Sequence, residues 1–498
     1  MRYLLLLFVG IVAWSSTLHL AMSASPAKLN PLIATDSASG EITGWIFNGL
    51  FKYDKNGDIV GDLAKRWEFR SDRELWVELR EGIVWHDGRP MSAEDVRFTF
   101  ELITSPKIFT PYASEFRYVQ KVEVLDKRHL LITYKKPYFK ALQTWMLGIV
   151  PQHILAKQKD VMTSSFNQHP IGTGPYWLEG FEVSKDITLH AFRRYFEHPP
   201  RIEKIVYHFL PDPSTQFLML KQHKLDVGTL TPLQLERQIS KRFKEFYNIY
   251  EMPSHGYTYL GFNLKNPKFK DKRVRQAINI AIDRQELIDI LFFSHARVCT
   301  GPFMPGTFAY DASVKAPKLD LERARRLLKE AGYDEKHPLE FEIATNSNNT
   351  LRLYAAQIIQ QQLSKIGVKV RIRAMEWQAF LNTVVMPRKF ETVLLGWGLG
   401  LTPDAYSIWH SEGSRPGGFN FIGYKNPKVD RLIKEAETTI DKERLATLYK
   451  EIFRLIVEDV PYVFLYIPNS ITVVNKAIKN VEPSIVGVMH NEIDWIKP

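Results

Sequence analysis

Hydrophobic and polar positions along this chain follow two different periods in turn. Alternation at every second residue marks extended segments with one wet face, as in TLHLAMSA and VKVRIRAMEW. The apolar run FETVLLGWG, which ends in glycine, predicts a buried strand, and VPYVFLYI predicts another strand after the last helices. The pattern therefore predicts strands over residues 17–24, 368–377, 390–398 and 460–467.

Helical periodicity fills much of the chain between these strands. Ser92 is expected to cap a helix, since Asp95 stands three residues further on as in a capping box. A second helix begins after Asp320 and ends at Gly332. The later helices are predicted over 350–367, 426–439 and 441–459. In the first of these, the spacing predicts a buried face made of Leu351, Tyr354, Ile358 and Leu363. The alternation predicts compact domains of mixed α/β type.

The first residues resemble a short secretory signal. Arg2 precedes an apolar run from Tyr3 to Trp14, which is too short to span a bilayer as a helix. We predict a signal peptide over residues 1–16 with cleavage near Ser15, because a later cut would remove the first strand. No Cys follows the apolar run, so a lipoprotein is excluded and an exported, soluble, periplasmic protein is expected.

Composition narrows the possible partners. The 498 residues carry a formal charge of +11, but Lys and Arg are dispersed among acids, which argues for a basic solvated surface and against nucleic acid binding. The single cysteine, Cys299, rules out an intrachain disulfide. Aromatic residues reach 12%, which suits either ligand-gripping surfaces or a large core.

No pattern of an enzyme stands out. The sequence lacks G-x-S-x-G, H-E-x-x-H and G-x-x-x-x-G-K-[ST], and its 14 His are scattered without metal-ligand spacing. We therefore predict no catalytic activity and no cofactor, with a secreted hydrolase as a remote alternative. His410 and His490 remain candidates, because each lies beside aromatic residues near a chain reversal.

The stretch GWGLGLTPDAYSIWH, residues 396–410, is the strongest local candidate for a ligand site. It follows a buried strand and gathers two Trp, one Tyr, one His and one Asp. Ligands of α/β proteins tend to bind beyond the carboxyl ends of strands. The loop could face a substrate, a metal ion or only the protein's own core.

One long segment is far more specific. GDLAKRWEFRSDRELWVELREGIVWHDGRPMSAEDVRFTFE, from Gly61 to Glu101, resembles the signature of the family 5 bacterial extracellular solute-binding proteins, the peptide- and nickel-binding subunits of ABC importers. Other landmarks follow in the family's order, among them PIGTGPYWLEGF, YTYLGFNLKNPKFKDKRVRQAINIAIDRQEL and YIPNSITVVNKAIKN. The Asp87-Gly88 turn and the Ser92 cap within the signature have a folding role and are not a binding site.

The resemblance implies an α/β, two-lobed periplasmic-binding-protein fold of type II, in the three-domain peptide-binding variant. A hinge joins the lobes, and the ligand is buried in the cleft between them. Domain I would comprise residues 17–47, 174–261 and 473–498, domain II residues 48–173, and domain III residues 262–472.

The same resemblance implies a set of ligand-binding positions. Relatives that bind peptides hold the ligand's ammonium with an Asp soon after the Gly-Trp strand; here Thr402 replaces it. Asp404 remains, and either holds the ligand or caps the following helix. The implied positions on domain III are Trp377, Trp397, Gly398, Leu401, Thr402, Asp404 and Tyr406. Those on the facing lobe are Thr35, Asp36, Ser37 and Ala38.

The function implied is capture of a peptide-like ligand and its delivery to the inner-membrane permease of an ABC importer. A monomer is expected. The alternative cargo is a nickel chelate, for which imidazole nitrogens are suitable ligands. Under that alternative His410 and His490 would be the metal ligands and would converge on the cleft.

Overall fold

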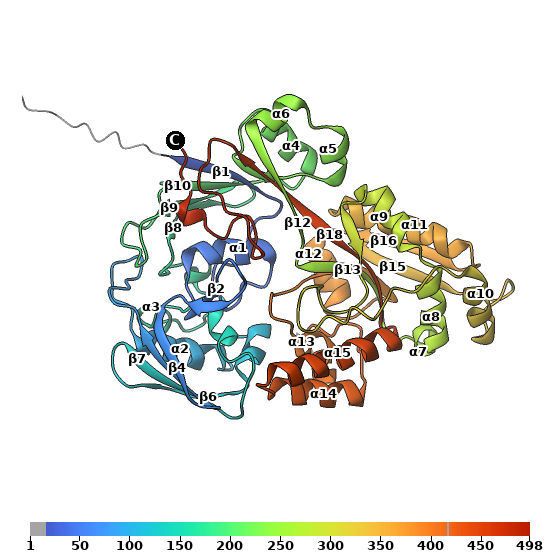
Figure 1. The fold of residues 1–498 in the computed structure, drawn as a ribbon, viewed down its shortest axis with the longest axis horizontal. Helices are drawn as coiled ribbons and strands as arrows, with labels where there is room; N and C mark the ends of the chain where they lie inside the picture. The colour runs from blue at the N-terminus through green and yellow to red at the C-terminus, as the bar shows by residue number, and fades with distance from the viewer. Residues whose placement is uncertain (1–15, 416–417) are drawn as a thin grey trace, which may run out of the picture.

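The computed structural model describes residues 16–415 and 418–498, so the predicted signal peptide lies outside the described residues apart from Ser16. Its backbone is one long mixed sheet flanked by helices, which confirms the α/β class (Figure 1). The strand order is β16-β15-β17-β13-β18-β11-β1-β10-β9-β8, and β12 and β14 also pair with β18. No helix among the described residues is both long and apolar enough to cross a membrane.

The strands of this sheet have the following bounds: β1 (Thr17–Met22), β8 (Tyr176–Glu182), β9 (Asp186–Ala191), β10 (Lys204–Phe209), β11 (Val227–Thr229), β12 (Tyr247–Pro253), β13 (Gly256–Phe262), β14 (Ala296–Val298), β15 (Glu340–Asn346), β16 (Lys369–Met375), β17 (Thr392–Gly398) and β18 (Tyr462–Asn475). The predicted strands at 17–24, 368–377, 390–398 and 460–467 are therefore confirmed, although β18 continues eight residues beyond the last of them. A smaller antiparallel sheet has the order β4-β5-β7-β6, from β4 (Ala64–Ser71), β5 (Glu74–Leu79), β6 (Val119–Val124) and β7 (His129–Tyr134). A separate hairpin joins β2 (Phe51–Tyr53) to β3 (Ile59–Gly61).

Strand β18 holds the two parts of the large sheet together. Its first residues pair with β13 and β14, and its last residues pair with β11 and β12. The buried apolar clusters divide at the same place. Two of them draw on residues 18–252 and 471–495, whereas the other two draw on residues 257–467, with only Phe139 packing against one of them from outside this range. We call residues 16–255 and 468–498 the first lobe, and residues 256–467 the second lobe.

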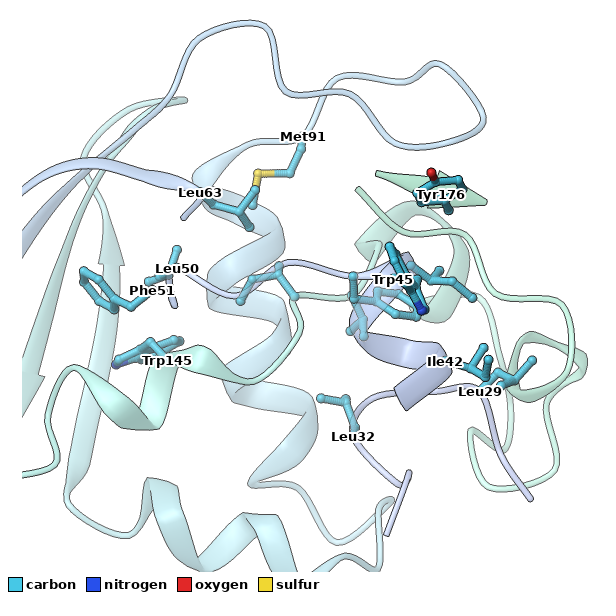
Figure 2. Packing of buried hydrophobic residues seen from close by; sticks show 14 of the residues in the cluster. Leu29, Leu32, Ile42, Trp45, Leu50, Phe51, Leu63, Met91, Trp145 and Tyr176 are labelled. Atoms are coloured by element: carbon cyan, nitrogen blue, oxygen red, sulfur yellow. The ribbon is translucent and has the colours of Figure 1, made fainter. Parts of the chain in front are cut away.

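The larger of the two apolar clusters in the first lobe runs from the lobe's part of the large sheet into the small sheet. Trp45 of α1 packs edge-on against Tyr176, with ring centroids 5.1 Å apart, and Ile42, Leu63 and Met91 belong to the same cluster (Figure 2). The helices of this lobe are α1 (Ser37–Ile46), α2 (Ala93–Ile103), α3 (Gln152–Leu155), α4 (Pro213–Lys221), α5 (Pro232–Arg237) and α6 (Lys241–Phe246). The predicted capping box is present at the start of α2, formed by Ser92 and Asp95.

The second lobe covers its strands with helices on both sides. They are α7 (Pro267–Lys270), α8 (Lys272–Ala281), α9 (Arg284–Phe292), α10 (Leu321–Glu330), α11 (Thr350–Ser364), α12 (Trp377–Phe380), α13 (Tyr406–Trp409), α14 (Pro427–Glu437) and α15 (Lys442–Asp459). Figure 1 shows α14 and α15 next to the part of the first lobe that carries β6. This placement brings the two lobes into contact at a point far from β18.

The predicted buried face of α11 is wrong in part. Tyr354 is 48% exposed, and the helix buries Ala355, Ala356 and Ile359 together with Leu363. Small alanine side chains let the helix approach the sheet closely, so the face that contacts the sheet is turned by about one residue from the predicted one.

Candidate functional site

The parallel strands of the second lobe end at one edge of the sheet, and aromatic residues gather there. β15 pairs in parallel with both β16 and β17, so their carboxyl ends coincide. Trp377 begins α12 just after β16, and Trp397 lies at the end of β17. Trp397 stacks on Phe421 with ring centroids 5.6 Å apart, and its indole N–H lies 3.3 Å from the hydroxyl oxygen of Tyr462. Both tryptophans are half-buried, which leaves part of each ring free for a ligand.

Arg352 lies at the same edge and was not predicted from the sequence. It belongs to α11 and donates to the Asn346 side chain at the end of β15, over 2.6 Å. A Cβ atom on Gly396 would come within 3.1 Å of its guanidinium, which places that group beside β17. Burial lowers the pKa of Arg352 from its usual value. No ion pair joins it to a carboxylate in the part of the chain that the structure describes, and its Nε has no hydrogen-bond partner there.

The loop after β17 faces the first lobe. The hydroxyl oxygens of Thr402 and Tyr53 lie 2.9 Å apart. Leu401 lies near Gly57 of the β2–β3 hairpin, where an added Cβ would be 3.6 Å from the Leu401 Cδ1 atom. The loop that stood out in the sequence is therefore part of the contact between the lobes.

Asp404 has partners in its own lobe and in the other lobe. Its carboxylate accepts hydrogen bonds from the Tyr406 backbone N–H (2.9 Å) and the Ser407 hydroxyl (2.6 Å), close to the start of α13. Across the lobes, Lys140 Nζ lies 3.4 Å from Asp404 Oδ2. Although burial opposes the charged form, Lys140 and these hydrogen bonds hold the pKa of Asp404 below its usual value.

Lys140 also binds an acid of its own lobe. Its Nζ donates to Glu115 over 2.5 Å, and the residue is only 5% exposed. Burial would lower the pKa of Lys140, but the charges of Asp404 and Glu115 outweigh it and keep the pKa well above its usual value. Lys140 is therefore a buried cation shared by two acids, one from each lobe.

A second polar contact joins the lobes nearby. Arg117 of the first lobe forms an ion pair with Glu437 of α14, and the Tyr118 hydroxyl donates to the same carboxylate over 2.8 Å. The Arg117 guanidinium lies over the ring of Tyr406, 3.8 Å from its centroid. A cavity of about 560 Å³ opens at this contact, lined by Arg117, Tyr118 and Lys136 from the first lobe and by Tyr406, Glu412 and Lys434 from the second.

Comparison with known proteins identifies the family of this two-lobed chain. A model described as bacterial extracellular solute-binding proteins, family 5 Middle, matches residues 58–419. The chain belongs to this family. By this description its members are solute-binding proteins.

Relatives within the family cover nearly the whole chain. The oligopeptide-binding protein AppA of Bacillus subtilis is 29% identical over 464 residues, 89% of this chain and 85% of the relative. The structure of AppA in complex with a nonapeptide matches with a TM-score of 0.89 at 27% identity, covering 97% of this chain and 99% of that one. The structure of NikZ from Campylobacter jejuni in complex with Ni(L-His) matches with a TM-score of 0.88 at 30% identity, covering 97% and 100%.

The family positions predicted on the first lobe lie at the start of α1. Asp36 caps this helix and accepts hydrogen bonds from the backbone N–H and the hydroxyl of Ser39. Ala38 is buried, while Thr35 and Ser37 are exposed. Gly398, the last residue of β17, is exposed as well. These positions remain predictions for ligand contact.

The two histidines proposed as nickel ligands have different surroundings, and their convergence on the cleft stays a prediction. His410 is 2% exposed, stacks on Tyr406 and accepts a hydrogen bond from the Glu412 backbone N–H through Nδ1. Burial lowers its pKa. His490 is half-exposed in the C-terminal segment. Within residues 16–415 and 418–498, no group of three or more His, Cys, Asp or Glu side chains is arranged to hold a metal ion.

Proposed function

We propose that this protein captures peptides between its lobes and delivers them to the inner-membrane permease of an ABC importer. The observation that carries the proposal is Arg352, a half-buried guanidinium at the ligand edge of the sheet whose Nε is buried and which has no carboxylate partner among the described residues. A buried cation is costly unless it is paired, and the carboxylate of a peptide would pair with it. The half-buried rings of Trp377 and Trp397, which lie just after β16 and at the end of β17, would accept apolar side chains.

The similarity to AppA over nearly the whole chain supports the same proposal. In this arrangement the protein works by binding and lobe closure, without catalysing a reaction. We propose the domain division given by the resemblance, with residues 17–47, 174–261 and 473–498 in domain I, 48–173 in domain II and 262–472 in domain III. Domains I and II then correspond to the first lobe and domain III to the second, apart from residues 256–261 and 468–472 at the boundary. We further propose that the protein is an exported monomer of the periplasm.

A nickel chelate is the second candidate cargo, and the match to NikZ at 30% identity favours keeping it. His490 remains available as one imidazole ligand from the protein, and a chelator would supply the others.

Native mass spectrometry of the protein purified from its host without refolding tests both candidates. A heterogeneous set of small adducts that fragment as peptides would support the proposal. A single adduct with the isotope pattern of nickel, lost in the His490→Ala variant, would replace peptide by metal chelate as the cargo.

A further inference from the structure

The ammonium group of Lys140 lies next to the Asp404 carboxylate, in a place that the ammonium group of a ligand could otherwise occupy. Asp404 is the acid left in the loop that follows β17, and its Oδ2 faces Lys140 Nζ at 3.4 Å. A carboxylate offers about four acceptor sites. The Tyr406 N–H and the Ser407 hydroxyl fill two of them, and Lys140 faces a third.

The surroundings of Lys140 fix this arrangement. Its side chain is 5% exposed, and its Nζ is anchored to Glu115 over 2.5 Å. Phe139 next to it packs edge-on against Tyr449 of the second lobe, and the Tyr449 hydroxyl reaches the Pro403 carbonyl oxygen, 3.3 Å away. The ammonium group of Lys140 therefore cannot leave Asp404 without separating the lobes at this point.

Electrostatics then excludes a second cation. The two acids Glu115 and Asp404 share one ammonium group, and Arg117 lies close enough to lower the pKa of Asp404 further. Arg117 is itself paired with Glu437. A ligand ammonium brought to Asp404 would meet two protein cations of the same sign, in a site where water screens little.

We propose that Lys140 determines specificity by closing Asp404 to the ammonium group of a ligand, so that the protein binds peptides without recognising a free amino terminus at this acid. This inference rests on the proposed function. Lys140 has its effect by occupying Asp404 and does not itself contact the ligand, so it is a positioning residue. The contact between Lys140 and Asp404 forms only when the lobes meet. Closure at this point then depends on the protein's own charge pair instead of the ligand's terminus.

The first test compares an alanine-rich nonapeptide with a free amino terminus and its N-acetylated form, by calorimetry. The quantity of interest is the ratio of the two dissociation constants, acetylated over free. When Lys140 is present, the Asp404→Asn substitution should leave this ratio at the native value. In Lys140→Met the ratio should rise at least tenfold, and it should return to the native value in Lys140→Met/Asp404→Asn. An unchanged ratio in Lys140→Met, or a ratio lowered by Asp404→Asn alone, would overturn the inference.

The second test needs no peptide, so it separates failure of this inference from failure of the proposed function. Lys140→Ala leaves a space beside Asp404 that n-butylammonium can fill. We expect millimolar n-butylammonium chloride to raise the melting temperature of Lys140→Ala more than the same concentration of sodium chloride does. In the native protein and in Lys140→Ala/Asp404→Asn, the two salts should have the same effect. Equal shifts in all three proteins would overturn the inference even if no nonapeptide binds.

Discussion

The hydroxyl groups of Tyr53 and Thr402 lie 2.9 Å apart, although 349 residues separate them in the chain. Tyr53 belongs to the first lobe and Thr402 to the second, so this hydrogen bond exists only when the lobes meet. Thr402 stands where peptide-binding relatives are expected to carry an Asp. A position expected to bind ligand therefore helps to close the protein.

Removing either hydroxyl should weaken closure. A neutral hydrogen bond contributes about 1 kcal/mol net, so Tyr53→Phe or Thr402→Val should weaken the binding of a co-purified peptide about fivefold in calorimetry. The double variant should cost no more than either single change, because one bond is lost in each case. Additive losses would show that the two groups act separately.

Arg352→Met should weaken peptide binding about 10- to 100-fold. Hydrogen bonds to charged groups are worth about 1.5–3 kcal/mol, and each 1.4 kcal/mol is a factor of ten in affinity. Calorimetry with a peptide and its C-terminally amidated form should show a preference for the free carboxylate in the native protein but not in the variant. Arg444→Met is a matched control, since Arg444 pairs with Glu435 on the surface. If amidation costs the native protein nothing, Arg352 does not bind the carboxylate.

His295 lies at the junction of the lobes and should make the stability of the protein depend on pH. Its two ring nitrogens lie 2.8 Å from Glu251 and 2.9 Å from Glu236, both in the first lobe. Burial alone would lower the pKa of His295, but hydrogen bonds and charge from these two acids raise it above its usual value. The stabilisation is therefore fully present below the ordinary pKa of histidine and is lost as pH rises through the raised pKa.

The measurement is the melting temperature of the native protein and of His295→Gln from pH 5 to pH 9. The native protein should melt higher near pH 6, and the difference should shrink toward pH 9. Burial would raise the pKa of Glu251, but its hydrogen bonds to Asn469 and His295 outweigh burial and hold the pKa below its usual value. The difference in melting temperature should therefore shrink again only in stronger acid. A difference that does not vary with pH would contradict an imidazolium at this place.

Asp95→Ala should destabilise the fold without changing ligand binding. The Asp95 carboxylate is buried and accepts hydrogen bonds from the backbone N–H groups of Ser92 and Gln152. A buried donor left without a partner costs about 1–3 kcal/mol, so urea unfolding should show a loss of about 2 kcal/mol or more. Unchanged peptide affinity would support the folding role of the signature around Ser92, and a large loss of affinity would contradict it.

The sequence was most informative where local rules operate. The caps at Ser92 and Asp320 and the glycine ends at Gly332 and Gly367 depend on a few neighbouring residues, so the helix bounds could be predicted closely. The face of α11 could not, because two alanines look neutral in a hydrophobic pattern yet decide how closely the helix packs.

The candidate site shows the opposite limit. Nothing near Asp404 in the sequence indicates Lys140, which reaches it from a loop more than 250 residues earlier in the chain. Arg352 was missed because an arginine in a helix is usually a solvated helix former, and only the sheet edge beside it shows that its guanidinium is partly buried. Whether a charged side chain can bind a ligand depends on its own partners in the fold, and the sequence does not show these partners.

The sharing of β18 between the lobes also has a consequence for how the chain acquires its structure. Synthesis proceeds from the amino terminus, so β11, β12, β13 and β14 emerge before the strand that they all pair with. Until residues 462–475 are present, these strands keep unpaired edges that can join with other chains. Assembly of the whole molecule thus depends on its last tenth, and a chain interrupted before this point would be left prone to aggregation in both lobes at once.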